Sequence, residues 1–291
     1  MEDLVRVDDF LGNGGREVVV VAPFWAGPNP GDGSLMEVDC FSSRGALLWS
    51  YVPHDTITFG NQELKGPWSI YDLMVSHEGG KRWIWVLAVH QHWGNSFVVQ
   101  IDPETGHGQG RFVNTGVLYA LNELRTARGT ILLVGGFNNE YEAGSLAVVD
   151  ESSAFAASPQ TAGTIHKCTS CPGGDPNYYF VFPRSEINVL RKEWLDAVGA
   201  IVANGDGIQI SKYELSRSGA QTLYSFRLEP VVRAASLRFS SPYVMEHRER
   251  ERSHQLDHSL AECPERKHPK PIRMWSRSAG WEELPVSAVA P

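Results

Sequence analysis

The chain has 291 residues, of which 42% are hydrophobic, and a formal net charge of −8. This composition is typical of a globular chain and not of a disordered one. The negative charge disfavours nucleic acid and anionic lipid as partners, because both bind clustered positive charge. No run of about 18 apolar residues occurs, so we expect no membrane-spanning helix. The N-terminus lacks the pattern of a signal peptide, and the location of the protein stays open.

One sequence pattern recurs along the chain: an apolar run, a polar loop, a small-residue step and a second apolar run ending in Asp. Three clear copies span residues 15–52, 82–113 and 128–153, and weaker copies span 197–215 and 243–275. The runs are short, rich in Val, Ile, Leu and aromatic residues, and bounded by turn residues, which is typical of β-strands. Internal repetition of this kind indicates a repeat architecture.

A further apolar strand is predicted before each copy, at residues 5–7, 69–75, 118–124, 186–190 and 234–239. Each unit then has four strands in antiparallel hairpins, and radial repetition of such sheets makes a β-propeller. We therefore expect an all-β fold and one propeller domain over residues 1–291. Its five blades would span about 1–66, 67–117, 118–176, 177–229 and 230–285. A ring of six or seven blades and a β-sandwich of repeated hairpins are the alternatives.

Little in the sequence favours helix. Residues 185–195 fit an amphipathic helical stretch, but the Asn-Val-Leu step inside them fits a strand equally well. The charge run EHRERER, residues 246–252, mixes both signs, and we interpret it as a solvated loop.

Two parts of the chain resemble known propeller repeats. Residues 5–23, VRVDDFLGNGGREVVVVAP, resemble the FG-GAP or VCBS repeat, and residues 33–52 and 95–106 are similar to the outer hairpins of quinoprotein-type blades. Residues 168–188 also look like part of uncharacterised bacterial propeller proteins, some attached to regulatory domains. The resemblance implies the fold more than a function, because propellers host many functions.

The FG-GAP loop often binds calcium through oxygen ligands at alternate positions. Carried over to this chain, the resemblance implies Asp9, Asn13 and Glu17 as ligands. The sequence departs from the family at Leu11, where Asn or Asp is usual, and Asn13 replaces the usual Asp. A glycine turn joining two strands, with no ion, is the alternative interpretation.

The four cysteines are too few for a disulfide scaffold at this length. Cys168 and Cys171 form a Cys-x-x-Cys pair, for which we predict a local disulfide or two free thiols. Zinc, with His166 as a third ligand, is an alternative that lacks a second cysteine pair. A redox pair is another, although the following Pro-Gly-Gly opposes the helix that would activate a thiol. A bond between Cys40 and Cys263 would join the first and last blades. Paired cysteines would indicate an extracytoplasmic, oxidising location.

The polar loops between the second and third strands of each unit should gather on one face. Aromatic rings beside amides and carboxylates are typical of sugar or peptide sites, whereas blade caps and turns are the structural alternative. The candidate binding residues are Trp25, His90, His92, Trp93, Asn138, Asn139, Glu140, Tyr141, Asn204 and Asp206.

The sequence contains no nucleophile elbow, phosphate loop or dinucleotide fingerprint. We therefore expect a non-enzymatic propeller domain that binds a carbohydrate, peptide or protein, as the sensor or scaffold part of a larger bacterial protein. No cofactor is expected apart from the calcium and zinc considered above. The alternative is a carbohydrate-active hydrolase or lyase with paired acids in a central pocket, for which Glu140, Glu142 and Asp206 are possible members.

Overall fold

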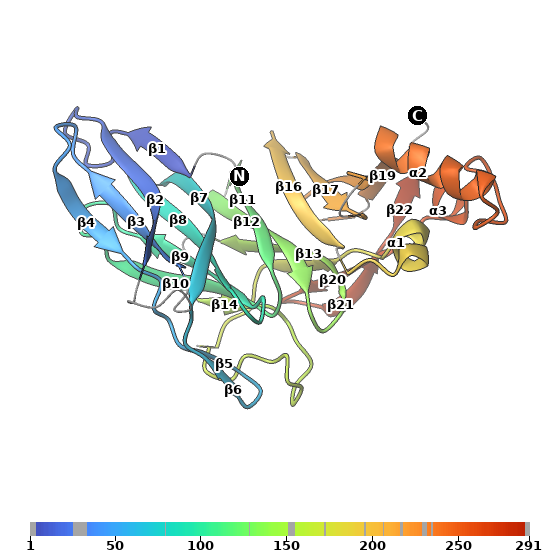
Figure 1. The fold of residues 1–291 in the computed structure, drawn as a ribbon, viewed down its shortest axis with the longest axis horizontal. Helices are drawn as coiled ribbons and strands as arrows, with labels where there is room; N and C mark the ends of the chain where they lie inside the picture. Colours follow the sequence, from blue (N-terminus) through green and yellow to red (C-terminus); the bar gives the residue numbers. More distant parts are fainter. Residues whose placement is uncertain are drawn as a thin grey trace. The chain divides into compact units, whose positions relative to one another are not determined.

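The computed structural model describes the chain except residues 1–3, 26–33, 79, 128, 151–154, 172, 195, 206, 216–217, 229–231, 234 and 289–291. The described part of the chain is mostly β, with 22 strands and three short helices (Figure 1). The chain divides into two compact units. The first unit comprises Met1–Leu121 and Glu151–Asp175, and the second comprises Asn122–Asp150 and Pro176–Pro291.

The first unit contains two larger sheets and a small hairpin. One sheet has the antiparallel order β1-β2-β3-β4, and the other has the order β14-β10-β9-β8-β7, with the short β14 parallel to β10. The strands are β1 (Val5–Asp8), β2 (Glu17–Trp25), β3 (Ser34–Phe41), β4 (Leu47–Tyr51), β5 (Ile57–Phe59), β6 (Gln62–Leu64), β7 (Trp68–Glu78), β8 (Lys81–His90), β9 (Ser96–Ile101), β10 (Gly108–Asn114) and β14 (Ala156–Ala157).

The core of the first unit lies between these two sheets. Strands β1 and β3 contact β7, and the fully buried Val19, Val38, Leu73, Ile84 and Ile101 belong to one apolar cluster. Strand β9 is buried along its whole length, which means that both of its faces are covered. Burial on both faces matches the consecutive apolar residues Phe97, Val98 and Val99 at its centre.

The second unit contains the rest of the β structure. A six-stranded sheet has the order β11-β12-β13-β15-β20-β21, and a five-stranded sheet has the order β16-β17-β18-β19-β22. Strand β11 begins in the first unit and ends in the second. The strands are β11 (Leu118–Thr126), β12 (Gly129–Asn138), β13 (Ala143–Asp150), β15 (Tyr178–Val181), β16 (Ala197–Asn204), β17 (Gly207–Tyr213), β18 (Gln221–Arg227), β19 (Ala235–Phe239), β20 (Ile272–Ser276), β21 (Gly280–Leu284) and β22 (Val286–Ala288).

The two sheets of the second unit approach closely where β12 and β13 contact β16. Gly135 permits this approach, because a Cβ at that position would lie 2.6 Å from the Cγ1 atom of Val198. Gly144 plays the same part beside the side chain of Lys212 and the carbonyl of Asp196. Small residues therefore set the spacing between the sheets.

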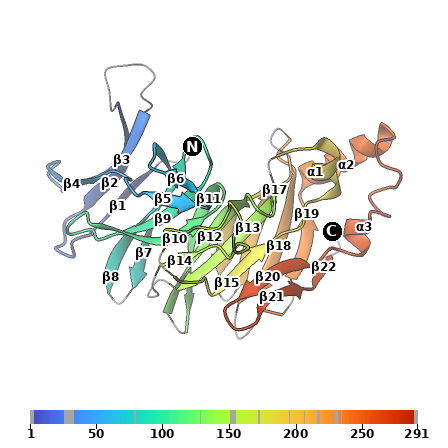
Figure 2. The same ribbon diagram turned by 90° about the horizontal axis from the view of Figure 1, so that it is seen from below.

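Three helices lie together at one end of the β16–β19 sheet: α1 (Glu186–Arg191), α2 (Ser241–Arg252) and α3 (Pro264–Lys267) (Figure 2). Ser185 and Ser240 cap α1 and α2, each accepting a hydrogen bond from the backbone N–H three residues later. The described helices are too short and polar for any of them to cross a membrane.

The structure corrects three sequence-based expectations. Residues 186–190 form helix α1 and not a strand, and the charge run 246–252 lies in α2 and not in a loop. The Ser240 cap, Pro in the first turn and the Glu246–Arg250 ion pair, four residues apart, favour helix there. Residues 230–285 do not form their own sheet, because β19 pairs with β18, and β20 and β21 extend the sheet of β15.

The other expected first strands, at residues 5–7, 69–75, 118–124 and 234–239, coincide with β1, β7, β11 and β19. The fold is therefore all-β, as expected from the short apolar runs. The radial arrangement of the sheets as propeller blades stays a prediction.

Candidate functional site

The predicted binding residues after β8 form a tight turn around His90. This side chain is buried, and its Nδ1 atom accepts hydrogen bonds from the backbone N–H groups of His92 (3.2 Å) and Trp93 (3.3 Å). Burial lowers the pKa of His90, although a hydrogen bond with the backbone of Gly66 opposes this. His90 is therefore a neutral imidazole that organises the turn. His92 and Trp93 are exposed, and Trp93 is 56% exposed.

The predicted binding residues after β12 form a second turn of the same kind. The buried Asn138 accepts hydrogen bonds at Oδ1 from the backbone N–H groups of Glu140 (3.0 Å) and Tyr141 (3.3 Å). Its amide nitrogen donates to the hydroxyl of Tyr179 at 2.7 Å. Asn139 and Glu140 are half-buried. Asn138 thus holds the turn by the side-chain to backbone bonding that is typical of Asn.

The ring of Tyr141 contacts Arg273 and Trp281 of the same unit. The guanidinium of Arg273 lies 4.9 Å from the centre of the Tyr141 ring and 4.7 Å from that of Trp281. The two rings meet edge to face at 5.3 Å. Burial raises the pKa of Tyr141 to about 12. This cation–π contact links the β12–β13 turn to β20 and β21, which is a structural role for the ring.

The remaining candidates are not brought to these turns. Strand β16 begins next to Asp196, whose carbonyl lies beside Gly144 and so near the Asn138 turn. Asn204 is the last residue of the same strand. Asn204 therefore lies at the far end of β16, away from the Asn138 turn. Asp206 and the side chain of Trp25 lie outside the described residues. Trp25 ends β2, so it, like the His90 turn, belongs to the first unit.

The loop that resembles the FG-GAP repeat satisfies its own backbone. Asp9 accepts hydrogen bonds from the backbone N–H groups of Asn13 (2.9 Å) and Gly14 (3.1 Å), and Glu17 accepts one from Leu11 at 3.3 Å. The carboxylates implied as calcium ligands thus accept hydrogen bonds from the turn itself. Calcium prefers six to eight oxygen ligands, and this bonding supports the interpretation as a glycine turn.

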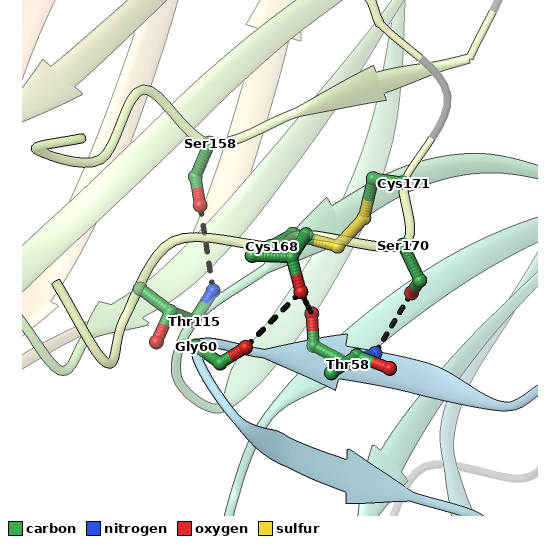
Figure 3. The surroundings of a disulfide bond; sticks show 8 residues. Thr58, Gly60, Thr115, Ser158, Cys168, Ser170 and Cys171 are labelled. Carbon is green, nitrogen blue, oxygen red and sulfur yellow. Dashed lines mark hydrogen bonds between the residues drawn. A yellow bond between two sulfur atoms is a disulfide. The ribbon is translucent and has the colours of Figure 1, made fainter. Parts of the chain in front are cut away.

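Cys168 and Cys171 are joined by a disulfide in the first unit, with their Cα atoms 5.7 Å apart (Figure 3). The loop between them docks on the β5–β6 hairpin. The backbone N–H of Thr169 donates to the carbonyl of Thr58 at 2.8 Å, and the Ser170 hydroxyl accepts from the N–H of Thr58 at 2.8 Å. With both sulfurs in the bond, neither is a thiolate ligand for zinc.

Cys40 and Cys263 are buried and are not disulfide-bonded, so the bond considered above as a link between the first and last blades is not formed. Burial raises the pKa of Cys40 to about 11 and also raises that of Cys263. Cys40 packs as a small apolar residue in the core of the first unit. Cys263 precedes α3 in the second unit.

The second unit has a pocket of about 500 Å³. It lies where β12 begins, β13 ends, β15 begins and β20 ends, at the end of the sheet opposite the Asn138 turn. Polar and apolar groups share its wall, and those that define its chemistry are Ile131, Asp150, Asn177, Tyr178, Leu228 and Arg277. A volume of roughly 300–1,000 Å³ suits a small molecule.

Sequence reasoning missed this pocket and a second cluster. The sequence shows Asp150 as the Asp at the end of a repeated apolar run. The residues that line the pocket with it include Tyr178, Leu228 and Arg277, which are far from it in the sequence. The second cluster consists of Glu186, His247, His258 and Cys263. Its signal is the spacing His-x10-His-x4-Cys within residues 247–263.

The fold and these sites define an all-β chain with a ligand-sized pocket. No protein-family model matches the chain, and no curated protein shows significant sequence similarity to it. Its function is therefore argued from the sites themselves.

Proposed function

We propose that this chain is a non-enzymatic carbohydrate-binding protein with propeller-type sheets, and that the pocket of the second unit holds the sugar. The observation that carries the proposal is the pocket of about 500 Å³ with its mixed polar and apolar wall. The antiparallel sheets β1–β4 and β7–β10, each corresponding to one expected blade, support the propeller part.

The wall of the pocket matches the chemistry of a sugar ring. Asp150 offers a carboxylate to hydroxyl donors, and Arg277 and Asn177 offer N–H donors to hydroxyl oxygens. The half-buried Tyr178 supplies an aromatic face for the apolar C–H side of the ring. Ile131, together with Tyr178, keeps part of the wall apolar.

Binding is favoured over glycoside cleavage by the acids present. Cleavage requires two carboxyl groups about 5–9.5 Å apart. Among the described lining residues, Asp150 is the one carboxylate. The pocket thus supports recognition of hydroxyl groups without a paired acid.

The experiment is a screen of mono- and oligosaccharides against the intact chain, followed by calorimetric titration of the best binder. Asp150→Asn and Arg277→Ala should each weaken binding about tenfold or more, since a charge-assisted hydrogen bond contributes about 1.5–3 kcal/mol. The matched control is Arg238→Ala, an exposed arginine on β19 that does not line the pocket. It should bind like the unsubstituted chain.

Two results would refute the proposal. One is the absence of binding to any saccharide at millimolar concentration by the folded chain. The other is a saccharide that binds equally well to the Asp150 and Arg277 variants, which would place its site elsewhere. Thermal unfolding of each variant verifies that the fold is retained.

A further inference from the structure

Four metal-ligating side chains converge in the helical part of the second unit. Glu186 opens α1, His247 lies in α2, His258 follows α2, and Cys263 precedes α3. One ligand atom from each lies within 4.8 Å of the others. The cluster therefore joins one carboxylate, two imidazoles and one thiol from four separate positions on the chain.

His247 is the most informative member of this cluster. Its side chain is fully buried, and within the part of the chain that the structure describes, neither ring nitrogen has a hydrogen-bond partner. A buried imidazole without hydrogen bonds is costly in either tautomer, because one nitrogen carries an unsatisfied N–H and the other an unused lone pair. A bound cation would accept that lone pair directly.

The geometry of His258 also fits a bound cation. Its Nδ1 atom lies 2.9 Å from a carboxylate oxygen of Asp257, and its Nε2 atom lies 3.2 Å from Oε2 of Glu186. In the neutral ring with its hydrogen on Nδ1, the N–H donates a hydrogen bond to Asp257, and the lone pair of Nε2 faces a lone pair of Glu186 Oε2. A positive ion bound by both atoms removes this repulsion. A carboxylate that holds the other nitrogen of a ligating histidine is the usual second layer of a metal site.

Cys263 completes the set of donors. It is fully buried and not disulfide-bonded, and its sulfur lies within 4.8 Å of a ligand atom of each other member of the cluster. A metal ion would bind this sulfur as a thiolate, with release of the thiol proton.

We propose that Glu186, His247, His258 and Cys263 bind one Zn²⁺ ion in a closed structural site. Two imidazoles, a thiolate and a carboxylate form a borderline-soft donor set that suits zinc, and four protein ligands fill its tetrahedral shell. Bonds of about 2.0–2.3 Å require donor separations of roughly 3.3–3.8 Å, which the cluster reaches by a small contraction. This site is separate from the pocket and does not depend on sugar binding.

The first test is the metal content of the intact chain after expression in zinc-supplemented medium, measured by mass spectrometry. We expect one zinc per chain. Cys263→Ser should lose it, whereas Cys40→Ser should retain it, and this control is matched because Cys40 is the other buried free thiol. A chain without stoichiometric zinc, or equal zinc in the two variants, would overturn the proposal.

A second measurement covers the case in which Cys263→Ser fails to fold. Replacing zinc by Co²⁺ in the unsubstituted chain should give a thiolate-to-cobalt charge-transfer band and the intense visible bands of a tetrahedral site. Asp257→Asn, at a 98% exposed side chain that is not itself a ligand, should weaken zinc binding about 10- to 100-fold. The absence of the charge-transfer band, or unchanged affinity in Asp257→Asn, would contradict the assignment.

Discussion

A buried charge network in the second unit supports a quantitative prediction. The Nζ atom of Lys212 contacts the carboxylates of Asp196 and Glu214, the latter at 2.7 Å, and all three side chains are fully buried. The Thr222 hydroxyl donates to Glu214 at 2.5 Å, and the backbone N–H of Gly144 donates to Asp196 at 3.3 Å. Burial opposes the charge on Lys212, but the two carboxylates raise its pKa above the ordinary value. The network therefore links β13, β17 and β18 through one ammonium group.

Lys212→Met removes the cation and leaves two carboxylates buried without it. Breaking a buried ion pair in this way costs about 3–5 kcal/mol. The second unit has roughly 145 residues, and an unfolding entropy of about 2.1 cal/mol/K per residue gives about 0.3 kcal/mol/K. The Tm of the second unit should therefore fall by roughly 10–16 °C.

Differential scanning calorimetry at neutral pH measures this shift. Lys65→Met is the matched control, because Lys65 forms an ion pair of 2.7 Å with Glu63 on the surface, where the two side chains are 72% and 51% exposed. Solvent screens such a pair, so its loss should leave the Tm unchanged. A decrease of less than about 3 °C for Lys212→Met would refute the reasoning, because it would mean that the carboxylates become neutral at little cost.

Two further predictions concern the same sheet pair. Burial raises the pKa of Asp196 from 3.8 to about 6, although Lys212 lowers it. The folded state then holds this proton more tightly than the unfolded state. The contribution of Asp196 to the unfolding free energy is therefore present below pH 3.8 and is lost as the pH rises through about 6. Asp196→Asn should flatten denaturant-unfolding data between these pH values, and an unaltered pH slope would count against this assignment. Gly199→Ala should lower stability by about 1–3 kcal/mol, because its Cβ would overlap the Tyr213 ring, whereas Gly207→Ala, with its nearest neighbour at 3.4 Å, serves as control. Equal thermal shifts in the two alanine variants would exclude the steric explanation.

The strands were predictable because their signals are local. A run of Val, Ile and Leu between turn residues is enough to predict a short, buried β-strand. This suffices for β1, β7 and β11, and the hairpin β12–β13 follows from one repeat of the pattern. Which sheets become neighbours depends on contacts between distant residues, such as Gly135 with Val198, and no periodicity encodes these.

Helix α1 shows where local signals are ambiguous. Its sequence alternates apolar and polar residues well enough for a strand, and the helix is only six residues long. What decides its conformation is the Ser185 cap, the left-handed backbone at Lys192 and the burial of Ile187 in a small cluster with Tyr243. Tyr243 lies more than 50 positions away, so this contact is not visible in the local sequence.

For the candidate site residues, the sequence likewise showed the residue types but not the contacts that these residues make. His90, Asn138 and Tyr141 were chosen for their chemical type, and in the structure their polar atoms or rings hold turns together. Polar side chains in a tight turn commonly form hydrogen bonds with the backbone of that turn. The pocket around Asp150 lies at the other end of the sheet, where strand ends from separate hairpins meet.

The position of the donor cluster explains why a metal ion would matter to this fold. The chain leaves the larger sheet after β15 and returns at β20, and these two strands pair directly, Val181 opposite Arg273. Strands β16 to β19 and all three helices are therefore inserted between neighbouring strands of the larger sheet. Glu186 lies just after the exit and Cys263 shortly before the return, about 77 positions apart. In the chain-entropy model, a link closing a loop of this length contributes roughly 4.5 kcal/mol. An ion bound at these two stems would thus stabilise the β15–β20 pairing from outside the sheet.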